Sequence, residues 1–304
     1  MNFLCLSDLI IQYHELNVSK VDEVLGEPSP LDFMRYVSKN RPFIAKKAAR
    51  NWIACKKWNA EYLLKAMEGQ IVNVAISEGV LETTPNNLSF VKPLEVEEKF
   101  SDFLEAVQKQ ERSFQSNPNS DRTSEDTAST SPPTRYAQTQ NSNLPSEYAS
   151  LYPDVPKDGP PFARIALTKT PDAINFWLGN SHSVTALHKD NYENIYVQVV
   201  GQKHFVLLPP VEAPCVNEML LDGCTYALRD SRTEADVDEN GLPGIRRGDM
   251  EVQRDIPETK VPFACWDPDD PTHRATSFSH LSRPLRVTLD PGDMLYLPAM
   301  WYHK

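Results

Sequence analysis

The second half of the chain alternates short apolar runs with turn residues. The runs lie at residues 174–179 (INFWLG), 192–200 (YENIYVQVV), 203–210 (KHFVLLPP), 285–289 (LRVTL) and 294–298 (MLYLP). Short strands at this close spacing, with no helical stretch between them, favour a sandwich or barrel over a parallel sheet. We therefore expect the second half of the chain to be built mainly from β-strands.

Two stretches interrupt the pattern of apolar residues. Residues 211–260 are charged and contain glycines, and we interpret them as a long excursion between two barrel strands. Residues 111–134 are rich in Ser, Thr, Asn, Asp and Pro and have almost no apolar residues. A segment of that composition buries too little surface to offset its ordering entropy, so we expect a disordered insertion there.

The first 110 residues show mainly helical periodicity. Apolar residues at helical spacing predict helices over residues 7–19, with Ser7 as the N-cap, from Pro28 onward, and over residues 95–110. The alternation at residues 71–76 predicts a strand. We expect residues 1–110 to form a region of helices and strands that packs on a barrel formed by residues 135–304.

Composition and charge restrict the possible partners. The 304 residues are 40% hydrophobic and 24% charged, which is ordinary for a globular protein. The formal net charge of -11 argues against a general nucleic-acid binder, since such binding needs clustered Lys and Arg, although it permits a basic peptide substrate. No apolar run approaches the length of a membrane span, so we expect no membrane partner.

The cysteines and the N-terminus bear on the cellular compartment. The five cysteines are odd in number and form no C-x-x-C pair, which argues against a disulfide framework and a zinc knuckle. The N-terminus has no basic stretch before its apolar run, and Asp8 interrupts that run, which disfavours a secretory signal. We expect a cytoplasmic protein and leave an additional nuclear location open.

The sequence His188-Lys189-Asp190 is the candidate for chemistry. Side chains alternate along a strand, so His188 and Asp190 would point to the same side. A His on a neighbouring strand would complete a set of three ligands, and His303 fits. Two His and one carboxylate leave coordination positions open, as in non-haem Fe(II) oxygenases. Isolated histidines are more often structural, so this motif needs support from its surroundings.

Four motifs in order provide that support. They are NFWLG at residues 175–179, T-x-x-H-x-D at 185–190, G-x-K-x-F at 201–205 and GDMLYLPAMWYH at 292–303. Together they resemble the Jumonji C (JmjC) family of Fe(II)- and 2-oxoglutarate-dependent dioxygenases, and the resemblance covers nearly the whole chain except residues 111–134. It implies a mainly β fold with flanking helices, in which a double-stranded β-helix of the cupin or jelly-roll type forms the barrel.

The resemblance also implies roles for particular residues. Lys203 matches the residue that pairs with the distal carboxylate of 2-oxoglutarate, and it lies between apolar runs where an unpaired Lys would be costly. Tyr136 and Thr185 match the hydroxyls that add hydrogen bonds to that carboxylate, although both also suit ordinary core positions. The residues that match the Fe(II) ligands are His188, Asp190 and His303.

An activity follows from the same resemblance. Enzymes of this family consume O2 and 2-oxoglutarate, release succinate and CO2, and hydroxylate a C–H bond of the substrate. The small-protein branch, which residues 136–147 and 261–271 resemble, points to a lysine side chain of a GTP-binding protein as the target. Two alternatives stay open: a peptidase acting on histone tails, and a noncatalytic cupin-like binding module. A homodimer formed through helices outside the barrel is compatible with the family.

One departure from the family concerns the C-terminal side of the site. Family members continue the strand that carries the last ligand and add another barrel strand, whereas Lys304 is the last residue here. A ligand on terminal backbone frays unless that backbone is held. We therefore expect this 304-residue form to be truncated and to bind iron less tightly than a longer one.

Overall fold

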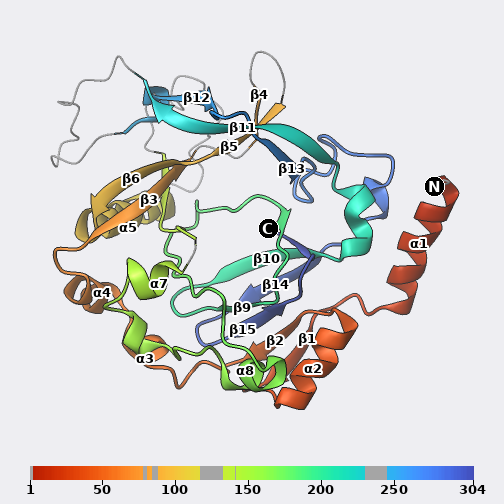
Figure 1. The fold of residues 1–304 in the computed structure, drawn as a ribbon, viewed down its shortest axis with the longest axis horizontal. Coiled ribbons are helices and arrows are strands. Elements are labelled where there is room, and N and C mark those ends of the chain that lie inside the picture. The colour runs from red at the N-terminus through yellow and green to blue at the C-terminus, as the bar shows by residue number, and fades with distance from the viewer. Residues whose placement is uncertain (1–2, 78–80, 84–87, 117–132, 141, 230–244) are drawn as a thin grey trace.

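The computed structural model describes residues 3–77, 81–83, 88–116, 133–140, 142–229 and 245–304 (Figure 1). Its helices are α1 (Phe3–Leu16), α2 (Pro30–Lys39), α3 (Ile53–Lys57), α4 (Ala60–Ala66), α5 (Phe100–Ser116), α7 (Asn143–Ser146) and α8 (Pro161–Leu167). Its strands are β1 (Asp22–Leu25), β2 (Phe43–Lys46), β3 (Ile71–Ser77), β4 (Leu81–Thr83), β5 (Leu88–Lys92), β6 (Leu94–Lys99), β7 (Thr134–Tyr136), β8 (His188–Lys189), β9 (Asn194–Val197), β10 (Lys203–Leu208), β11 (Glu218–Leu228), β12 (Met250–Arg254), β13 (Lys260–Ala264), β14 (Leu285–Leu289), β15 (Met294–Leu297) and β16 (Tyr302–His303).

Two four-stranded sheets form the cupin-type barrel. One has the strand order β1-β2-β15-β9 and the other the order β14-β10-β16-β8. Alternate residues of each strand point to opposite faces, so Leu295 and Leu297 of β15 face the barrel interior while Met294 and Tyr296 face outward. The interior cluster joins the two sheets through Ile44, Phe205, Leu207, Leu289, Leu295, Leu297 and Trp301. This arrangement confirms the mainly β, double-stranded β-helix fold that the motifs imply.

Helices α2 and α8 cover the outer face of the first sheet (Figure 1). Ser29 caps α2 by accepting a hydrogen bond from the Asp32 N–H at 3.1 Å, and Pro30 occupies the first turn, where its missing N–H costs nothing. The buried Phe33 of α2 packs against Phe162 of α8, with 5.1 Å between the ring centroids. The helices therefore fix the position of the strands beneath them.

A third sheet covers the outer face of the second one. It has the order β12-β11-β5-β4, and β13 also pairs with β11. The layer between these sheets is apolar and contains Leu187, Val206, Leu208, Val216, Ala264, Trp266 and Tyr302. Strands from residues 1–110 pair with strands from residues 135–304, since β2 pairs with β15 and β5 pairs with β11. The two halves of the chain therefore share their sheets.

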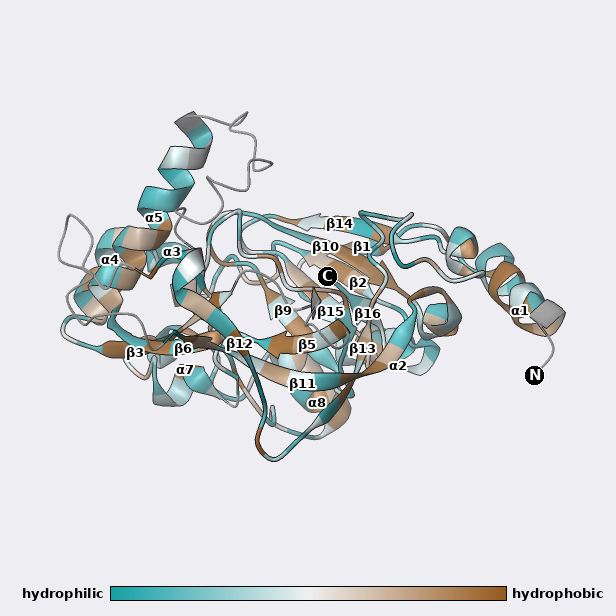
Figure 2. Ribbon diagram, turned by 90° about the horizontal axis from the view of Figure 1, so that it is seen from above, coloured by the Kyte–Doolittle hydropathy of each residue, from teal (hydrophilic) through white to brown (hydrophobic). Residues whose placement is uncertain are grey.

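A further sheet and α5 lie to one side of the barrel. The sheet has the order β6-β3-β7, and α5 follows β6 directly. Figure 2 shows α5 and α1 at opposite ends of the molecule, each with both hydrophilic and hydrophobic residues along it. Helix α1 packs on the 3-10 helices at Pro210–Cys215 and Ser279–Leu281. None of the helices that the structure describes is long and apolar enough to cross a membrane.

Several element predictions are wrong in part. Residues 95–99 belong to strand β6, because Leu94 and Val96 alternate with glutamates and pair with β3, and the helix begins only at Phe100. Ser7 does not cap a helix, since α1 already begins at Phe3. Residues 174–179 form no strand, and only Leu178 makes a single bridge, to Ala137.

The two interrupting stretches also differ from expectation. Residues 211–260 are not merely an excursion, because β11 and β12 and the start of β13 lie within them. The predicted insertion at residues 111–134 is too wide, since α5 continues to Ser116 and β7 begins at Thr134. Residues 117–132 lie outside the described residues, so the prediction of disorder stays a prediction there.

Candidate active site

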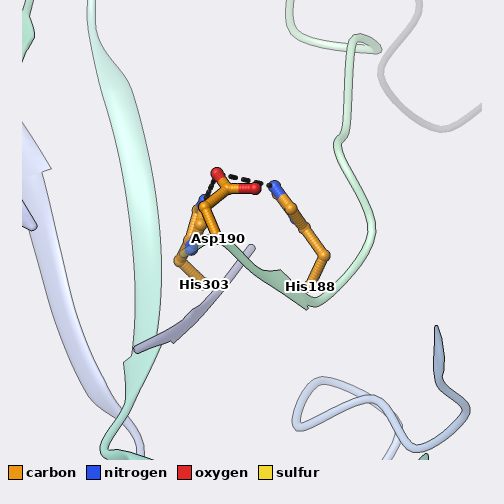
Figure 3. A group of neighbouring side chains, drawn as sticks. All are labelled: His188, Asp190 and His303. Atoms are coloured by element: carbon orange, nitrogen blue, oxygen red, sulfur yellow. Dashed lines mark ion pairs between the residues drawn. The ribbon is translucent and has the colours of Figure 1, made fainter. Parts of the chain in front are cut away.

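The structure brings His188, Asp190 and His303 together at one end of the barrel (Figure 3). Strands β8 and β16 run antiparallel and place His188 directly opposite His303, while Asp190 follows β8. The Asp190 Oδ2 lies 3.8 Å from His188 Nε2 and 3.7 Å from His303 Nε2. One ligand atom from each residue lies within 4.8 Å of the others, so a single ion can reach all three.

Backbone carbonyls orient both imidazole rings. His188 Nδ1 lies 2.8 Å from the Ala186 carbonyl, and His303 Nδ1 lies 3.1 Å from the Trp301 carbonyl. A carbonyl oxygen can only accept, so each Nδ1 carries the hydrogen and each Nε2 keeps its lone pair. Metal-binding histidines typically have such a second partner. Figure 3 shows a ring nitrogen of each histidine directed at the Asp190 carboxylate, and this nitrogen is Nε2 in both.

Burial differs among the three residues. His303 is buried, and burial first, then the neighbouring His188, lower its pKa, so its ring is neutral at neutral pH. The Asp190 side chain is 48% exposed and therefore lies on the open side of the site. A neutral imidazole and an ionised carboxylate are the states in which these groups bind metals.

Hydrogen bonds on both sides hold the backbone around His303. Strand β16 pairs with β8 and with β10, and Lys304 exchanges two backbone hydrogen bonds of 3.0 Å with Val206. The Met300 N–H donates to the Asp190 carbonyl at 2.7 Å from a left-handed conformation with φ of 70°. The backbone of His303 is thus held in place, while the weaker iron binding expected above stays a prediction.

Lys203, Tyr136 and Thr185 meet beside this site. The Lys203 ammonium lies 3.4 Å from the Tyr136 hydroxyl, to which it donates, and it also faces the Tyr136 and Phe205 rings. Burial lowers the pKa of Lys203. Lys203 lies on β10, which pairs with β16 and places Leu207 opposite His303. Lys203 alternates onto the same face as the interior residues Phe205 and Leu207, so the two groups of residues lie on adjacent strands of one sheet.

The hydroxyl groups of this pocket are deeply buried. Tyr136 is 8% exposed, and burial first and then Tyr196 raise its pKa, while the Thr185 hydroxyl opposes that rise. Thr185 Oγ1 is buried and makes no hydrogen bond of ordinary geometry with the described residues. A buried hydroxyl and a partly buried ammonium without an anionic partner are costly. An anionic carboxylate would bind both, so these residues fit the distal end of 2-oxoglutarate.

Tyr196 is a residue of the pocket that the sequence motifs did not identify. It lies on β9 and points to the barrel interior, where its ring packs 5.0 Å from that of Phe205 and burial raises its pKa to about 12. Its neighbours Ile195 and Val197 point to the opposite face. Alternation along the strand between Asp190 and Lys203 was the signal that could have found it.

The fold and the site together define a class of protein. The family model described as the cupin-like domain matches residues 28–304, which is most of the chain. The chain belongs to the cupin-like JmjC-domain family, whose enzymes are oxygenases that use Fe(II) and 2-oxoglutarate.

Three relatives illustrate what the chain is similar to. It is 35% identical to the human bifunctional peptidase and (3S)-lysyl hydroxylase JMJD7, over 91% of this chain and 77% of the relative. It is 30% identical to JmjC domain-containing protein E of Dictyostelium discoideum, over 98% and 82%. It is 28% identical to the lysine-specific demethylase JMJ32 of Arabidopsis thaliana, over 98% and 80%.

Proposed function

We propose that this protein is an Fe(II)- and 2-oxoglutarate-dependent hydroxylase that acts on a lysine side chain of a protein substrate. The observation that carries the proposal is the convergence of His188, Asp190 and His303 on strands next to β10, which carries Lys203, together with the buried, unsatisfied hydroxyl of Thr185. A metal set alone would suit many reactions. Three metal ligands next to a pocket whose side chains can bind a carboxylate suit a keto acid cosubstrate.

Each residue has a task in this proposal. His188, Asp190 and His303 would hold Fe(II) through two Nε2 atoms and a carboxylate oxygen. Bound iron and 2-oxoglutarate supply the oxidising chemistry that hydroxylates a C–H bond. Lys203 would pair with the distal carboxylate, and Tyr136 and Thr185 would donate hydrogen bonds to it.

The lysine target rests on the relatives and on charge. Two of the relatives are named for lysine, one as a lysyl hydroxylase and one as a lysine-specific demethylase. Hydroxylation of a side-chain methylene of lysine and hydroxylation of an N-methyl group on lysine differ only in which carbon reaches the site. The net charge of -11 suits a basic segment as substrate. We take a lysine of a GTP-binding protein as the target, in keeping with the branch of the family.

The test is turnover with a defined peptide. The protein is incubated with Fe(II), O2, 2-oxoglutarate and lysine-containing peptides from GTP-binding proteins, and succinate and peptide mass are measured together. We expect succinate in step with one added oxygen on lysine, and neither product when that lysine is replaced by arginine or when His188→Ala is used. Demethylation of an N-methyl-lysine peptide without oxidation of the unmethylated one would overturn the choice of reaction.

The peptidase is the second candidate, because one relative is named as a bifunctional peptidase as well as a hydroxylase. Two His, one carboxylate and a pocket for a cosubstrate suit oxygen chemistry better than hydrolysis. The same incubation separates the candidates, since cleavage of histone-tail peptides without 2-oxoglutarate would support the peptidase. Metal binding with no turnover of either kind would support a noncatalytic cupin-like module.

A further inference from the structure

Behind the two histidines lies a second cross-strand pair. Strands β8 and β16 place Lys189 opposite Tyr302, one position along from the pair formed by His188 and His303. Side chains alternate along a strand, so Lys189 and Tyr302 point away from the metal site. Tyr302 is 1% exposed and packs in the apolar layer between the second sheet and the β11 sheet.

Glu218, the first residue of β11, closes a triangle with this pair. The Lys189 Nζ donates to Glu218 Oε2 at 2.6 Å and to the Tyr302 hydroxyl at 3.0 Å, and the Tyr302 hydroxyl donates to the same Oε2 at 3.0 Å. The Lys189 ammonium also lies 4.9 Å from the centre of the Tyr302 ring. Three mutual contacts restrict the side chains of Lys189, Glu218 and Tyr302 far more than one ion pair would. We call these three residues the Lys189 triangle.

The triangle adds side-chain contacts to a strand that has a short backbone ladder. Strand β8 is the edge of its sheet and contributes only His188 and Lys189 to the ladder. Glu218 belongs to a different sheet and is itself fixed by pairing with Ala264 of β13. The triangle therefore connects the short edge strand that carries His188, and leads into Asp190, to a long strand anchored elsewhere.

We propose that Glu218, Lys189 and Tyr302 are positioning residues that set the separation of the metal ligands by fixing β8 against β16. This inference rests on the proposed metal site. Partners that orient metal ligands from behind typically contribute about 10- to 100-fold to metal affinity. The triangle acts through backbone and not through the ligand rings, and both charged side chains are about one quarter exposed. We therefore expect the lower end, about tenfold.

The experiment measures the affinity for Mn(II) alone, by titration of the whole protein, together with thermal unfolding of the metal-free form. The variants are Glu218→Gln, Lys189→Met and Tyr302→Phe. Asp222→Asn is the matched control, because Asp222 also lies on β11 and forms ion pairs, but with Lys260 and Arg254 and not with the metal strand. We expect about tenfold weaker Mn(II) binding in each triangle variant and unchanged binding in the control.

Lys189→Met separates positioning from simple charge. Removing a positive charge near a cation site tightens cation binding if only charge matters, whereas loss of positioning weakens it. Tyr302→Phe changes no charge and keeps the ring in the apolar layer, so it tests the triangle even if another variant folds poorly. Tighter Mn(II) binding by Lys189→Met, or lower melting temperatures with unchanged Mn(II) affinity in all three variants, would overturn the inference. Failure of the unmodified protein to bind Mn(II) would instead overturn the proposed function on which it rests.

Discussion

Replacing Lys203 by Met should make the protein more stable and at the same time unable to bind 2-oxoglutarate. Among the described residues, the Lys203 ammonium has one hydrogen-bond partner, the Tyr136 hydroxyl at 3.4 Å, and no carboxylate. Met has a similar length and no charge, so it can fill the same space. A charged side chain that lies in a pocket and destabilises the fold is expected to bind a ligand of opposite charge.

The magnitude follows from opposing terms. A buried polar group that is left without adequate partners costs about 1–3 kcal/mol. The Tyr136 and Phe205 rings, 5.6 and 6.0 Å from the ammonium, return part of this, at about 0.5–1 kcal/mol per close contact. The net gain in the free energy of unfolding from Lys203→Met is therefore about 1 kcal/mol, or a rise of about 1.5 °C in the melting temperature of a chain of this length.

The pH dependence gives the prediction a sign. Burial lowers the pKa of Lys203 in the folded protein below that of the unfolded chain, so the unfolded chain binds more protons between the two values. The destabilisation is therefore fully present below the folded pKa and fades as the pH rises through it toward the unfolded value. The advantage of Lys203→Met should be largest below the folded pKa and should shrink as the pH rises through it.

The assay is thermal unfolding with Mn(II), with and without 2-oxoglutarate. We expect 2-oxoglutarate to raise the melting temperature of the unmodified protein and not that of Lys203→Met, since a charged hydrogen bond of about 1.5–3 kcal/mol corresponds to at least a tenfold loss of affinity. Lys92→Met is the control, because the Lys92 ammonium is half exposed and pairs with Asp255 at 2.9 Å. A Lys203→Met variant that melts below the unmodified protein, or that keeps the 2-oxoglutarate response, would refute the reasoning.

Three further outcomes are expected. Thr185→Val should weaken 2-oxoglutarate binding, leave Mn(II) affinity unchanged and not lower stability, because its buried hydroxyl makes no hydrogen bond of ordinary geometry with the described residues; equal losses in both titrations would contradict this. Gly179→Ala should weaken 2-oxoglutarate binding, because an added Cβ would lie 2.8 Å from Tyr136 Cδ2 and closer still to Ser183; unchanged binding would show that Tyr136 is not required in place. Asp293→Asn should lower stability at neutral pH by about 2–3 kcal/mol, because the buried Asp293 accepts hydrogen bonds from Lys46, Lys47 and Asp290. Burial raises the pKa of Asp293, but these donors lower it by more, so the folded pKa lies below that of the unfolded chain. The stabilisation by Asp293 is therefore present above about pH 4 and is lost as the pH falls through the folded pKa. A difference in melting temperature that persists in acid would contradict the assignment.

Local sequence was sufficient for residues whose role depends on spacing along one strand. His188 and Asp190 lie two positions apart, and Lys203 is a charged residue inside an apolar run, so each was visible without a fold. The Lys189 triangle was not visible in this way. Glu218 lies 29 residues from Lys189, and Tyr302 lies 113 residues from it. Only the pairing of β8 with β16, and the approach of β11, bring the three together.

Strand β11 shows why a stretch can resemble a loop and still be a strand. Its Asp222 and Gly223 are residues typical of turns. In the structure Gly223 forms two backbone hydrogen bonds with residues 255–259. Its N–H donates to the Thr259 carbonyl, and its carbonyl accepts from the Asp255 N–H. An added Cβ would lie 2.9 Å from the Asp255 carboxylate and closer still to the Thr259 side chain, so glycine is required by close approach and not by a turn.

The most direct test of the central claim is a titration of the unmodified protein and of His188→Ala with 2-oxoglutarate in the presence of Mn(II). If one site holds both the metal and the cosubstrate, the unmodified protein should bind 2-oxoglutarate only when Mn(II) is present, and His188→Ala should bind neither tightly. Metal-dependent binding of 2-oxoglutarate to His188→Ala with the affinity of the unmodified protein would contradict the claim that these residues form the site.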